Sequence, residues 1–200
     1  MQQELLTHAM NIFDSVDKWN AFIDLANQKD TIKDAYFSKV KEPLFRYFHE
    51  NQADGWVCEP WGDQTYDMRW YLKDFGKNSL GLGVGWRYDF VLTLEDPNRF
   101  DIEKMYSYLK SPESGKLLAA FERIDSFLPD QRRAIVETGN YSFDSPFDGN
   151  FKDAKHQLAW YAGNQTENFV RQIVNKVEKF RKNKEVTDLL YQINEKSKKY

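Results

Sequence analysis

The chain of 200 residues has a single cysteine, Cys58, and only three histidines. A disulfide within the chain is therefore impossible, and a zinc site built on several cysteines is excluded. The histidines, His8, His49 and His156, do not share the spacing of a metal-ligand pair, and no G-x-S-x-G nucleophile motif is present. We therefore predict no metal site and no cofactor.

Long apolar runs and a basic leader are also missing. The N-terminal MQQELLTHAM has no basic segment followed by an apolar one, and no stretch approaches the roughly 20 apolar residues of a membrane helix. A single cysteine is typical of a reducing compartment. The sequence thus predicts a soluble, cytoplasmic protein without a membrane partner.

Aromatic residues are abundant instead, at 16% of the chain, although hydrophobic residues reach only 41%. The mean hydropathy of -0.74 shows that the remainder is very polar. Because each aromatic side chain buries roughly 150–250 Å², a few of them can supply a core that is poor in aliphatic residues. We expect an aromatic core inside a charged shell.

The predicted architecture is one α+β domain over residues 1–200, an antiparallel sheet packed by N-terminal, middle and C-terminal helices. Its expected segments are helical 1–54, sheet 55–96, helices 100–128, a loop 138–153 and a C-terminal helix 164–196. Within them, Ser15 should cap a helix with an apolar stripe, and Pro43 should kink or restart the next one. Asp101 and Asn164 should cap two later helices.

Strict alternation of apolar residues from Leu80 to Leu94 is the strongest structural pattern, and it predicts one long strand. With a turn at residues 76–79, this strand forms a long aromatic hairpin with residues 67–75. The register then pairs Leu72 with Gly83 and Trp70 with Gly85, which places Trp70 over a strip of glycines. The run Gly81-Leu82-Gly83-Val84-Gly85 lacks the dinucleotide-binding spacing, so we assign it a structural role.

Two sets of candidate site residues lie near these strands. Glu59, Asp63 and Asp67 lie among tryptophans, which can raise a carboxyl pKa and favour acid/base catalysis. Exposure to water on an edge strand is the simpler interpretation. For a binding surface, aromatic and arginine residues are the typical interface contacts. The candidates for such contacts are Trp56, Trp61, Trp70, Arg87, Tyr141 and Phe147.

Charge is distributed unevenly along the chain. Residues 151–200 hold 11 Lys and Arg and 6 Asp and Glu, a balance of +5, whereas residues 1–150 have a balance of -8. A basic C-terminal helix could contact nucleic acid through phosphate neutralisation, or it could simply complement the acidic remainder. The candidate contacts are Arg171, Lys176, Lys179 and Lys182. The overall pI of about 5.7 argues against a dedicated nucleic-acid domain.

The segments Trp70-Tyr71-Leu72 and Gly85-Trp86, with the strand through Leu94, resemble the C-terminal accessory region of bacterial PD-(D/E)xK-nuclease-superfamily proteins. The resemblance covers most of the chain loosely. It lacks the nuclease motif, because the one (D/E)-x-K triplet considered, Asp153-Ala154-Lys155, follows a loop. The resemblance therefore implies a recognition or assembly role without catalysis.

Three hypotheses follow from the sequence. The first is a non-catalytic binding or regulatory module that recognises a protein through an aromatic-rich surface. The second is an acid/base enzyme, and the third is contact with nucleic acid, as in an accessory domain of a nucleic-acid-processing system. Homo-oligomerisation stays open.

Overall fold

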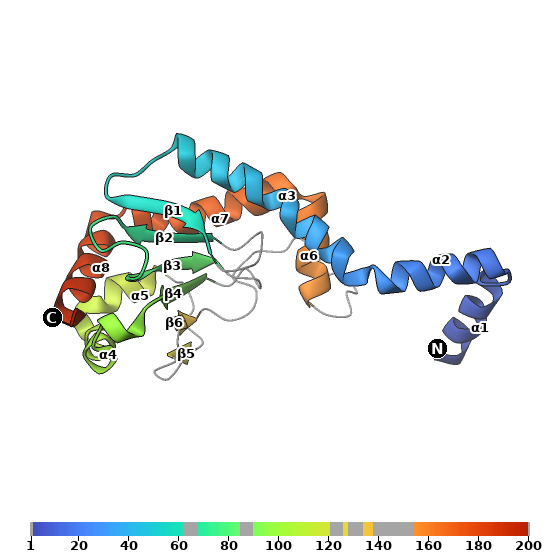
Figure 1. The fold of residues 1–200 in the computed structure, drawn as a ribbon, viewed down its shortest axis with the longest axis horizontal. Helices are drawn as coiled ribbons and strands as arrows, with labels where there is room; N and C mark the ends of the chain where they lie inside the picture. Colours follow the sequence, from blue (N-terminus) through green and yellow to red (C-terminus); the bar gives the residue numbers. More distant parts are fainter. Residues whose placement is uncertain are drawn as a thin grey trace.

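The structure, a computed structural model, describes residues 2–61, 68–84, 90–120, 126–127, 134–137 and 154–199. It confirms the α+β class, with one antiparallel sheet in the order β1-β2-β3-β4-β6-β5 and helices packed beside it (Figure 1). The strands are β1 (Trp56–Pro60), β2 (Met68–Leu72), β3 (Leu80–Val84), β4 (Phe90–Leu94), β5 (Ser126–Phe127) and β6 (Ala134–Glu137). The helices are α1 (Gln2–Ile12), α2 (Val16–Asn27), α3 (Lys29–Glu50), α4 (Ile102–Leu109), α5 (Gly115–Ala119), α6 (Ala154–Asn164), α7 (Thr166–Arg181) and α8 (Lys184–Ser197).

The predicted single strand from Leu80 to Leu94 is wrong, because the chain turns back within it. β3 and β4 are two strands that pair antiparallel, with Val84 opposite Phe90 and Leu80 opposite Leu94. The register keeps the even-numbered residues of both strands on the same face. The long aromatic hairpin of the prediction is therefore replaced by a meander of shorter strands.

The predicted register of β2 against β3 is also wrong. Gly83 lies opposite Arg69 and Trp70 lies opposite Leu82, a shift of three residues from the expected pairs. The reason is a longer turn: β2 ends at Leu72, and Gly76 adopts a left-handed conformation with φ of 72° inside the connection. A shift by an odd number exchanges the two faces of a strand, so Trp70 lies on the opposite face from the glycines.

One face of the sheet and the helices form a continuous hydrophobic core. Its strand members are the even-numbered residues, which share a buried cluster with side chains from α3, α4, α6, α7 and α8. These strand residues are Trp56, Met68, Trp70, Leu72, Leu80, Leu82, Val84, Leu92 and Leu94. Trp70 packs edge-on against Phe48 of α3, with ring centroids 4.9 Å apart. Every residue of β2 and β3 is buried, so the opposite face of these strands is covered too.

The long helix α3 continues through Pro43, so the chain does not restart there; the kink that was the other expectation stays a prediction. Four residues on one side of it enter the core: Phe37, Val40, Leu44 and Phe48. Its middle packs closely on α6. A Cβ atom added to Gly163 would lie 2.5 Å from Cγ of Tyr36, so a glycine allows this approach.

The C-terminal half of the chain departs from prediction in three places. Within the segment expected to be helical, 100–128, the structure describes α4 and α5, and Ser126–Phe127 form β5 instead. The C-terminal helix is two helices: α7 ends at Arg181, and Asn183 caps α8 by accepting hydrogen bonds from the N–H groups of Glu185 and Val186. Asn164 is no cap for α7, since its side chain bonds the carbonyl of Trp160 in α6. The predicted loop 138–153 lies outside the described residues.

Helix α8 is fastened to the sheet by a buried asparagine. Asn194 accepts a hydrogen bond from the N–H of Leu80 at 2.9 Å, and its amide donates to the carbonyl of Leu80 at 3.0 Å. Asn194 thus satisfies both backbone groups of Leu80 where β3 begins. The end of α8 is also joined to the N-cap of α4, since the Asp101 N–H donates to the carbonyl of Ser197.

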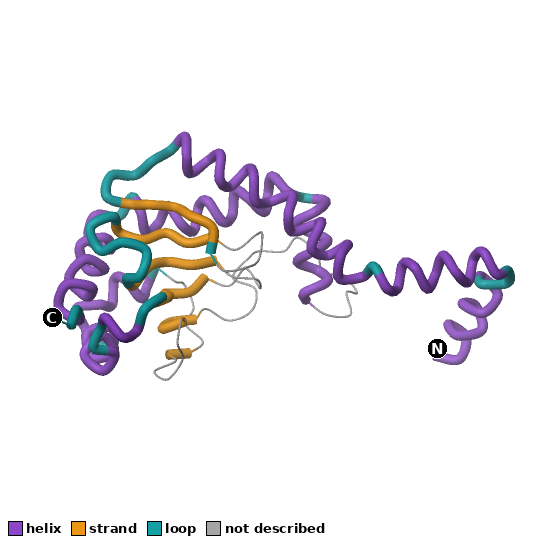
Figure 2. The backbone as a smooth tube through the Cα atoms, viewed as in Figure 1, coloured by secondary structure: helices purple, strands orange, loops and turns teal. Residues whose placement is uncertain are grey.

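Helices α1 and α2 extend away from the sheet as an N-terminal arm, defined here as residues 2–27 (Figures 1 and 2). A short loop separates α2 from α3, and α1 leaves the far end of α2 at an angle. Ser15 caps α2 as predicted, accepting a hydrogen bond from the N–H of Lys18. None of the residues of α2 is buried. Among the described helices, none is long and apolar enough to cross a membrane.

Candidate functional site

The carboxylate cluster of the acid/base hypothesis is described only at Glu59. This residue lies in β1, where its Oε2 accepts a hydrogen bond from the Tyr71 hydroxyl at 3.1 Å. Burial, and then the neighbouring Glu59, raise the pKa of Tyr71, which keeps the phenol protonated as a donor. Asp63 and Asp67 lie outside the described residues. Catalysis by these carboxylates therefore stays a prediction.

Arg69 lies beside this pair, and sequence reasoning had assigned it no role. It is almost fully buried, and its guanidinium donates hydrogen bonds to the carbonyls of Lys77, Ser79 and Thr93. Burial lowers its pKa to about 10, with Glu95 and Glu59 opposing that shift. Through these hydrogen bonds the guanidinium holds the turn after β2 in place, which is a structural role.

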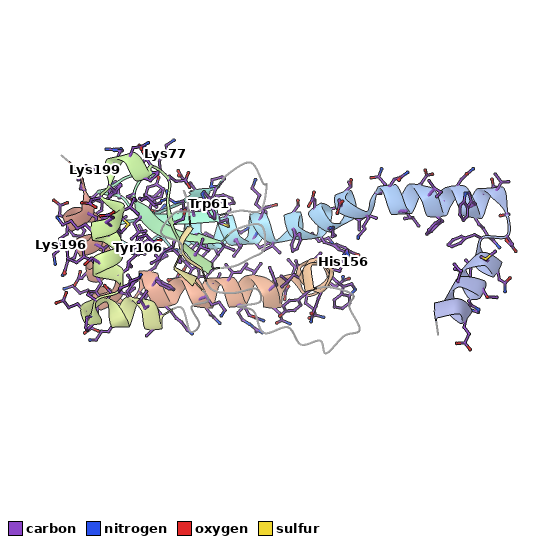
Figure 3. All side chains as sticks on the ribbon, turned by 90° about the horizontal axis from the view of Figure 1, so that it is seen from below. Trp61, Lys77, Tyr106, His156, Lys196 and Lys199 are labelled. Atoms are coloured by element: carbon purple, nitrogen blue, oxygen red, sulfur yellow. The ribbon has the colours of Figure 1, made fainter. Side chains whose placement is uncertain are left out.

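Trp61 lies at the end of β1, against the glycine-bearing face of β3 (Figure 3). A Cβ atom on Gly83 would lie 2.9 Å from the Trp61 ring, so the missing side chain makes room for the indole. The Trp61 N–H donates to the Glu95 carboxylate. Trp61, half-buried in the structure, takes the glycine-covering place that the predicted register gave to Trp70.

Trp56 and Trp70 are core residues, which corrects their prediction as surface contacts. Trp70 is 0% exposed and Trp56 is 9% exposed. Their indole N–H groups have no hydrogen-bond partner among the residues that the structure describes. They were selected because tryptophans are enriched at interfaces, but the same residues also fill cores. The other predicted contacts, Arg87, Tyr141 and Phe147, lie outside the described residues.

A pocket of about 410 Å³ opens where the end of α3, the start of β1 and the end of α7 meet. Its wall includes the two buried tryptophans, and also Phe48, His49, Cys58 and Arg181. Burial raises the pKa of the Cys58 thiol to about 12, although the charge of Arg181 opposes the shift. A protonated thiol is a poor nucleophile and a poor metal ligand. Cys58 is thus not an activated nucleophile in this pocket.

Arg181 is a buried cation whose partners come from the fold itself. Its Nη2 donates to the carbonyl of Asn51 at 2.6 Å, and Nη1 lies 3.6 Å from the Glu178 carboxylate. The guanidinium also covers the ring of Phe48 at 4.8 Å. Arg181 therefore joins the end of α3 to α7. No cluster of three potential metal ligands occurs among the residues that the structure describes.

The basic residues predicted for nucleic acid lie along α7. Arg171, Lys179 and Lys182 are exposed, and Lys176 is half-buried. Their spacing places them on one side of the helix. Acidic side chains are interspersed, since Lys182 Nζ lies 3.7 Å from Glu178 and the nearby Lys116 pairs with Glu185 at 2.7 Å. The positive surface is therefore partly neutralised.

The most exposed apolar surface of the described chain is on the N-terminal arm. Eight large hydrophobic side chains there are at least 38% exposed: Leu6, Met10, Ile12, Val16, Trp19, Phe22, Ile23 and Leu25. The sequence had indicated the stripe on α2 but not that it stays outside the core. A second amphipathic stretch at Leu6, Met10 and Phe13, directly before the cap at Ser15, was the available signal.

Comparison with protein-family models, curated proteins and solved structures found no match for this chain.

Proposed function

We propose that this chain is a non-catalytic binding module that recognises a protein partner, with the N-terminal arm as its contact surface. The observation that carries the proposal is the exposure of eight large apolar side chains on two consecutive helices. Their exposure ranges from 38% at Phe22 and Ile23 to 75% at Val16. This choice keeps the protein partner predicted from the sequence but moves the contact from the buried tryptophans to the arm.

The size of the arm's apolar surface favours a macromolecular partner. Because an aromatic side chain offers roughly 150–250 Å², Trp19 at 51% and Phe22 at 38% exposure alone leave roughly 130–220 Å² open, and six aliphatic side chains add to it. Monomeric proteins rarely expose contiguous apolar patches beyond a few hundred Å². At roughly 25 cal/mol per Å², covering such an area offers a large driving force for association.

The charge of the arm favours protein over a lipid surface. Its charged residues are Glu4, Asp14, Asp17, Lys18 and Asp24. Helices that lie in membrane interfaces are typically rich in Lys and Arg, which attract anionic lipids. Four acidic residues against one lysine would instead be repelled.

Site-specific photo-crosslinking in cells tests the proposal. A benzophenone amino acid replaces Trp19 on the apolar side of α2, and the matched control carries it at Asp24 on the polar side. We expect protein adducts from position 19 and few from position 24. Equal yields at both positions, or no protein adduct at position 19, would overturn the proposal.

Nucleic-acid contact through α7 is the alternative, favoured by the alignment of Arg171, Lys179 and Lys182. Phosphate neutralisation makes such binding weaken steeply with salt. A fluorescence-anisotropy titration with a single-stranded oligonucleotide over a salt series measures this. Binding that is absent at low salt, or insensitive to salt, excludes the alternative.

A further inference from the structure

We infer that the pocket between the end of α3, the start of β1 and the end of α7 binds a small organic carboxylate, with the apolar part of the molecule among the aromatic side chains of the wall. The inference is independent of the arm and its protein partner, because every residue that it uses lies beyond the arm. It adds a small-molecule site to a protein whose proposed partner is a macromolecule.

Three side chains in the wall of this pocket carry buried N–H groups that have no acceptor among the residues that the structure describes. They are the indole N–H groups of Trp56 and Trp70 and the Nε–H of Arg181. The three residues are 9%, 0% and 7% exposed. An unpaired buried donor costs its full desolvation penalty, so folded proteins rarely leave one without a partner. Three such donors around one pocket indicate a ligand that supplies acceptor atoms.

The three donors lie within the span of one small molecule. Trp56 and Trp70 are diagonal neighbours on one face of adjacent strands, because Trp70 lies opposite Cys58. Such neighbours are roughly 7–8 Å apart. Trp70 and Arg181 both contact Phe48, the indole with ring centroids 4.9 Å apart and the guanidinium at 4.8 Å from the ring centroid. One molecule in the pocket can therefore reach all three donors.

The donors and charges around the pocket favour a carboxylate. A carboxylate offers two oxygens with about four acceptor sites, which suffice for three donors, and its charge complements a guanidinium. Among the described lining residues, the cations Lys73 and Arg181 outnumber the acidic Asp54. Glu178 lies 3.6 Å from Nη1 of Arg181 and compensates part of this positive charge. A doubly charged phosphate would therefore be disfavoured, whereas a singly charged carboxylate matches what remains.

The volume and the wall of the pocket favour an apolar group attached to that carboxylate. At about 410 Å³ the pocket falls within the range of small-molecule sites, roughly 300–1,000 Å³. A cavity of about 150 Å³ already accommodates benzene. Phe45, Phe48 and the two tryptophans supply aromatic contacts. An aryl or short arylalkyl carboxylate fits both the donors and these rings.

The connection between α3 and β1, which forms one side of the pocket, is held in place by the fold. The Lys73 N–H donates to the Gly55 carbonyl at 2.7 Å. Nη2 of Arg181 donates to the Asn51 carbonyl at 2.6 Å. The pocket is therefore formed before a ligand binds. A site that is formed in advance loses less free energy to ordering, so even a small ligand can bind measurably.

Titration of the full chain, isotope-labelled at tryptophan and observed by nuclear magnetic resonance, tests the inference. The probes are benzoate, phenylacetate and phenylpropionate, in which the carboxylate lies progressively farther from the ring. We expect at least one probe to move the indole N–H resonances of Trp56 and Trp70 downfield, as a new hydrogen bond does. The shifts should saturate with a Kd of about 1 mM, typical of a ligand of this size. The resonances of the other tryptophans should stay in place.

Two substitutions and one neutral probe make the test specific. Trp56→Phe removes a donor but keeps an aromatic ring, so it should weaken binding about 10-fold. Trp61→Phe is the matched control, because the Trp61 N–H already donates to Glu95, and it should leave binding unchanged. Phenylacetamide, which lacks the charge that pairs with Arg181, should bind about 10-fold more weakly than phenylacetate. Circular dichroism verifies that both variants fold.

The inference is wrong if none of the three carboxylates shifts an indole resonance, or if all six indole resonances shift together. It is also wrong if phenylacetamide binds as tightly as phenylacetate, or if Trp56→Phe folds and binds with unchanged affinity. None of these results bears on the arm, so the crosslinking test of the proposed function succeeds or fails separately.

Discussion

Trp19 of the arm and Trp70 of the sheet occur in equally regular apolar patterns, yet one is 51% exposed and the other 0%. Trp19 belongs to a helical stripe, and Trp70 belongs to a strand whose partners are fixed on both sides. The comparison shows that amphipathic periodicity predicts a secondary structure and a direction, but not whether anything lies in that direction. The arm has the amphipathic pattern of an element that packs on a core, yet its large apolar side chains stay exposed.

The body, defined here as the described residues from Lys29 onward, covers its apolar residues because several elements converge on one sheet face. Phe48 of α3, Trp70 of β2 and Ile193 of α8 belong to the same buried cluster. In the arm, the aromatic contacts of Phe13, Trp19 and Phe22 join α2 only to the connection that follows α1. Two helices cannot enclose the side chains that each presents, so their outer apolar atoms stay exposed.

The largest expected contrast is between two tryptophan truncations. Trp70→Ala empties a fully enclosed volume and should lower the free energy of unfolding by about 3–5 kcal/mol. Trp19→Ala should change it by no more than about 0.5 kcal/mol, as for surface positions. Urea denaturation followed by circular dichroism measures both. If Trp19→Ala costs as much as Trp70→Ala, the arm is part of the core and the contrast is wrong.

The faces of β3 and β4 could be predicted from the sequence because alternation survives a change of direction. Leu80 and Leu94 point into the core as expected, although they sit on different strands. The register of β2 could not be predicted, since it depends on the length of a turn. Residues 73–79 form that turn, and it is held by Arg69, whose role depends on tertiary contacts.

The predicted helix N-caps were also correct at some positions and wrong at another. Ser15 and Asp101 were predicted as caps and are caps, because the hydrogen bond joins a side chain to a backbone three residues away. Asn164 had an equally suitable sequence context and failed, since α6 continues to it and takes up its amide. A capping residue can therefore be predicted from the local sequence where a loop precedes the helix. It cannot be predicted so simply where one helix directly follows another. The candidate binding residues were harder to predict than the helix caps. Tryptophan is common both in interfaces and in cores, so its presence does not tell which of the two it occupies.

The second prediction compares two glycines of the body, of which only one has room for an added methyl group. Gly81 faces the backbone of β2, and an added Cβ would lie 2.5 Å from the carbonyl oxygen of Trp70. Gly81→Ala should therefore destabilise the body by about 1–3 kcal/mol through forced backbone movement. Gly115 begins α5 with helical backbone angles and nothing within 4 Å of an added Cβ.

Gly115→Ala is thus the matched control, and it should stabilise the protein by about 0.4–1 kcal/mol. Thermal and urea unfolding of the two variants measure the pair of effects. Equal effects of both substitutions would show that the strands at Gly81 separate easily, and that the sheet is looser than the contacts indicate.

The third prediction concerns the pH dependence of stability that the buried thiol of Cys58 contributes. Below pH 9 the thiol is protonated in both folded and unfolded chains, so it contributes no pH dependence. Above that value the unfolded thiol ionises, while burial holds the folded pKa near 12. The raised folded pKa therefore makes stability fall as pH rises, by about 1.4 kcal/mol per unit between these pKa values.

We expect wild-type protein to lose about 1.4 kcal/mol more than Cys58→Ala between pH 8 and pH 10. Subtracting the variant removes other groups that titrate there, such as Tyr71. Adding Leu25→Cys to Cys58→Ala places the thiol on the exposed arm, where the steeper pH dependence should not return. Identical slopes for wild type and Cys58→Ala would mean that water reaches the thiol in the folded body.

The smallest contrast separates the arm from the body through their helix caps. Asp101 accepts a hydrogen bond from Lys104 N–H at 3.0 Å, and Ser15 accepts one from Lys18 N–H at 3.3 Å. Replacing either by Ala should remove about 1 kcal/mol of helix stability. Helix α4 contributes buried residues to the core, whereas α2 has none. The same loss of helix stability should therefore destabilise a larger part of the protein in Asp101→Ala than in Ser15→Ala. Hydrogen exchange resolved by peptide should show faster exchange across the body in Asp101→Ala, but only within residues 16–27 in Ser15→Ala. Faster exchange of the sheet in Ser15→Ala would show that arm and body unfold together, and would remove the distinction on which the arm's role as a separate contact surface depends.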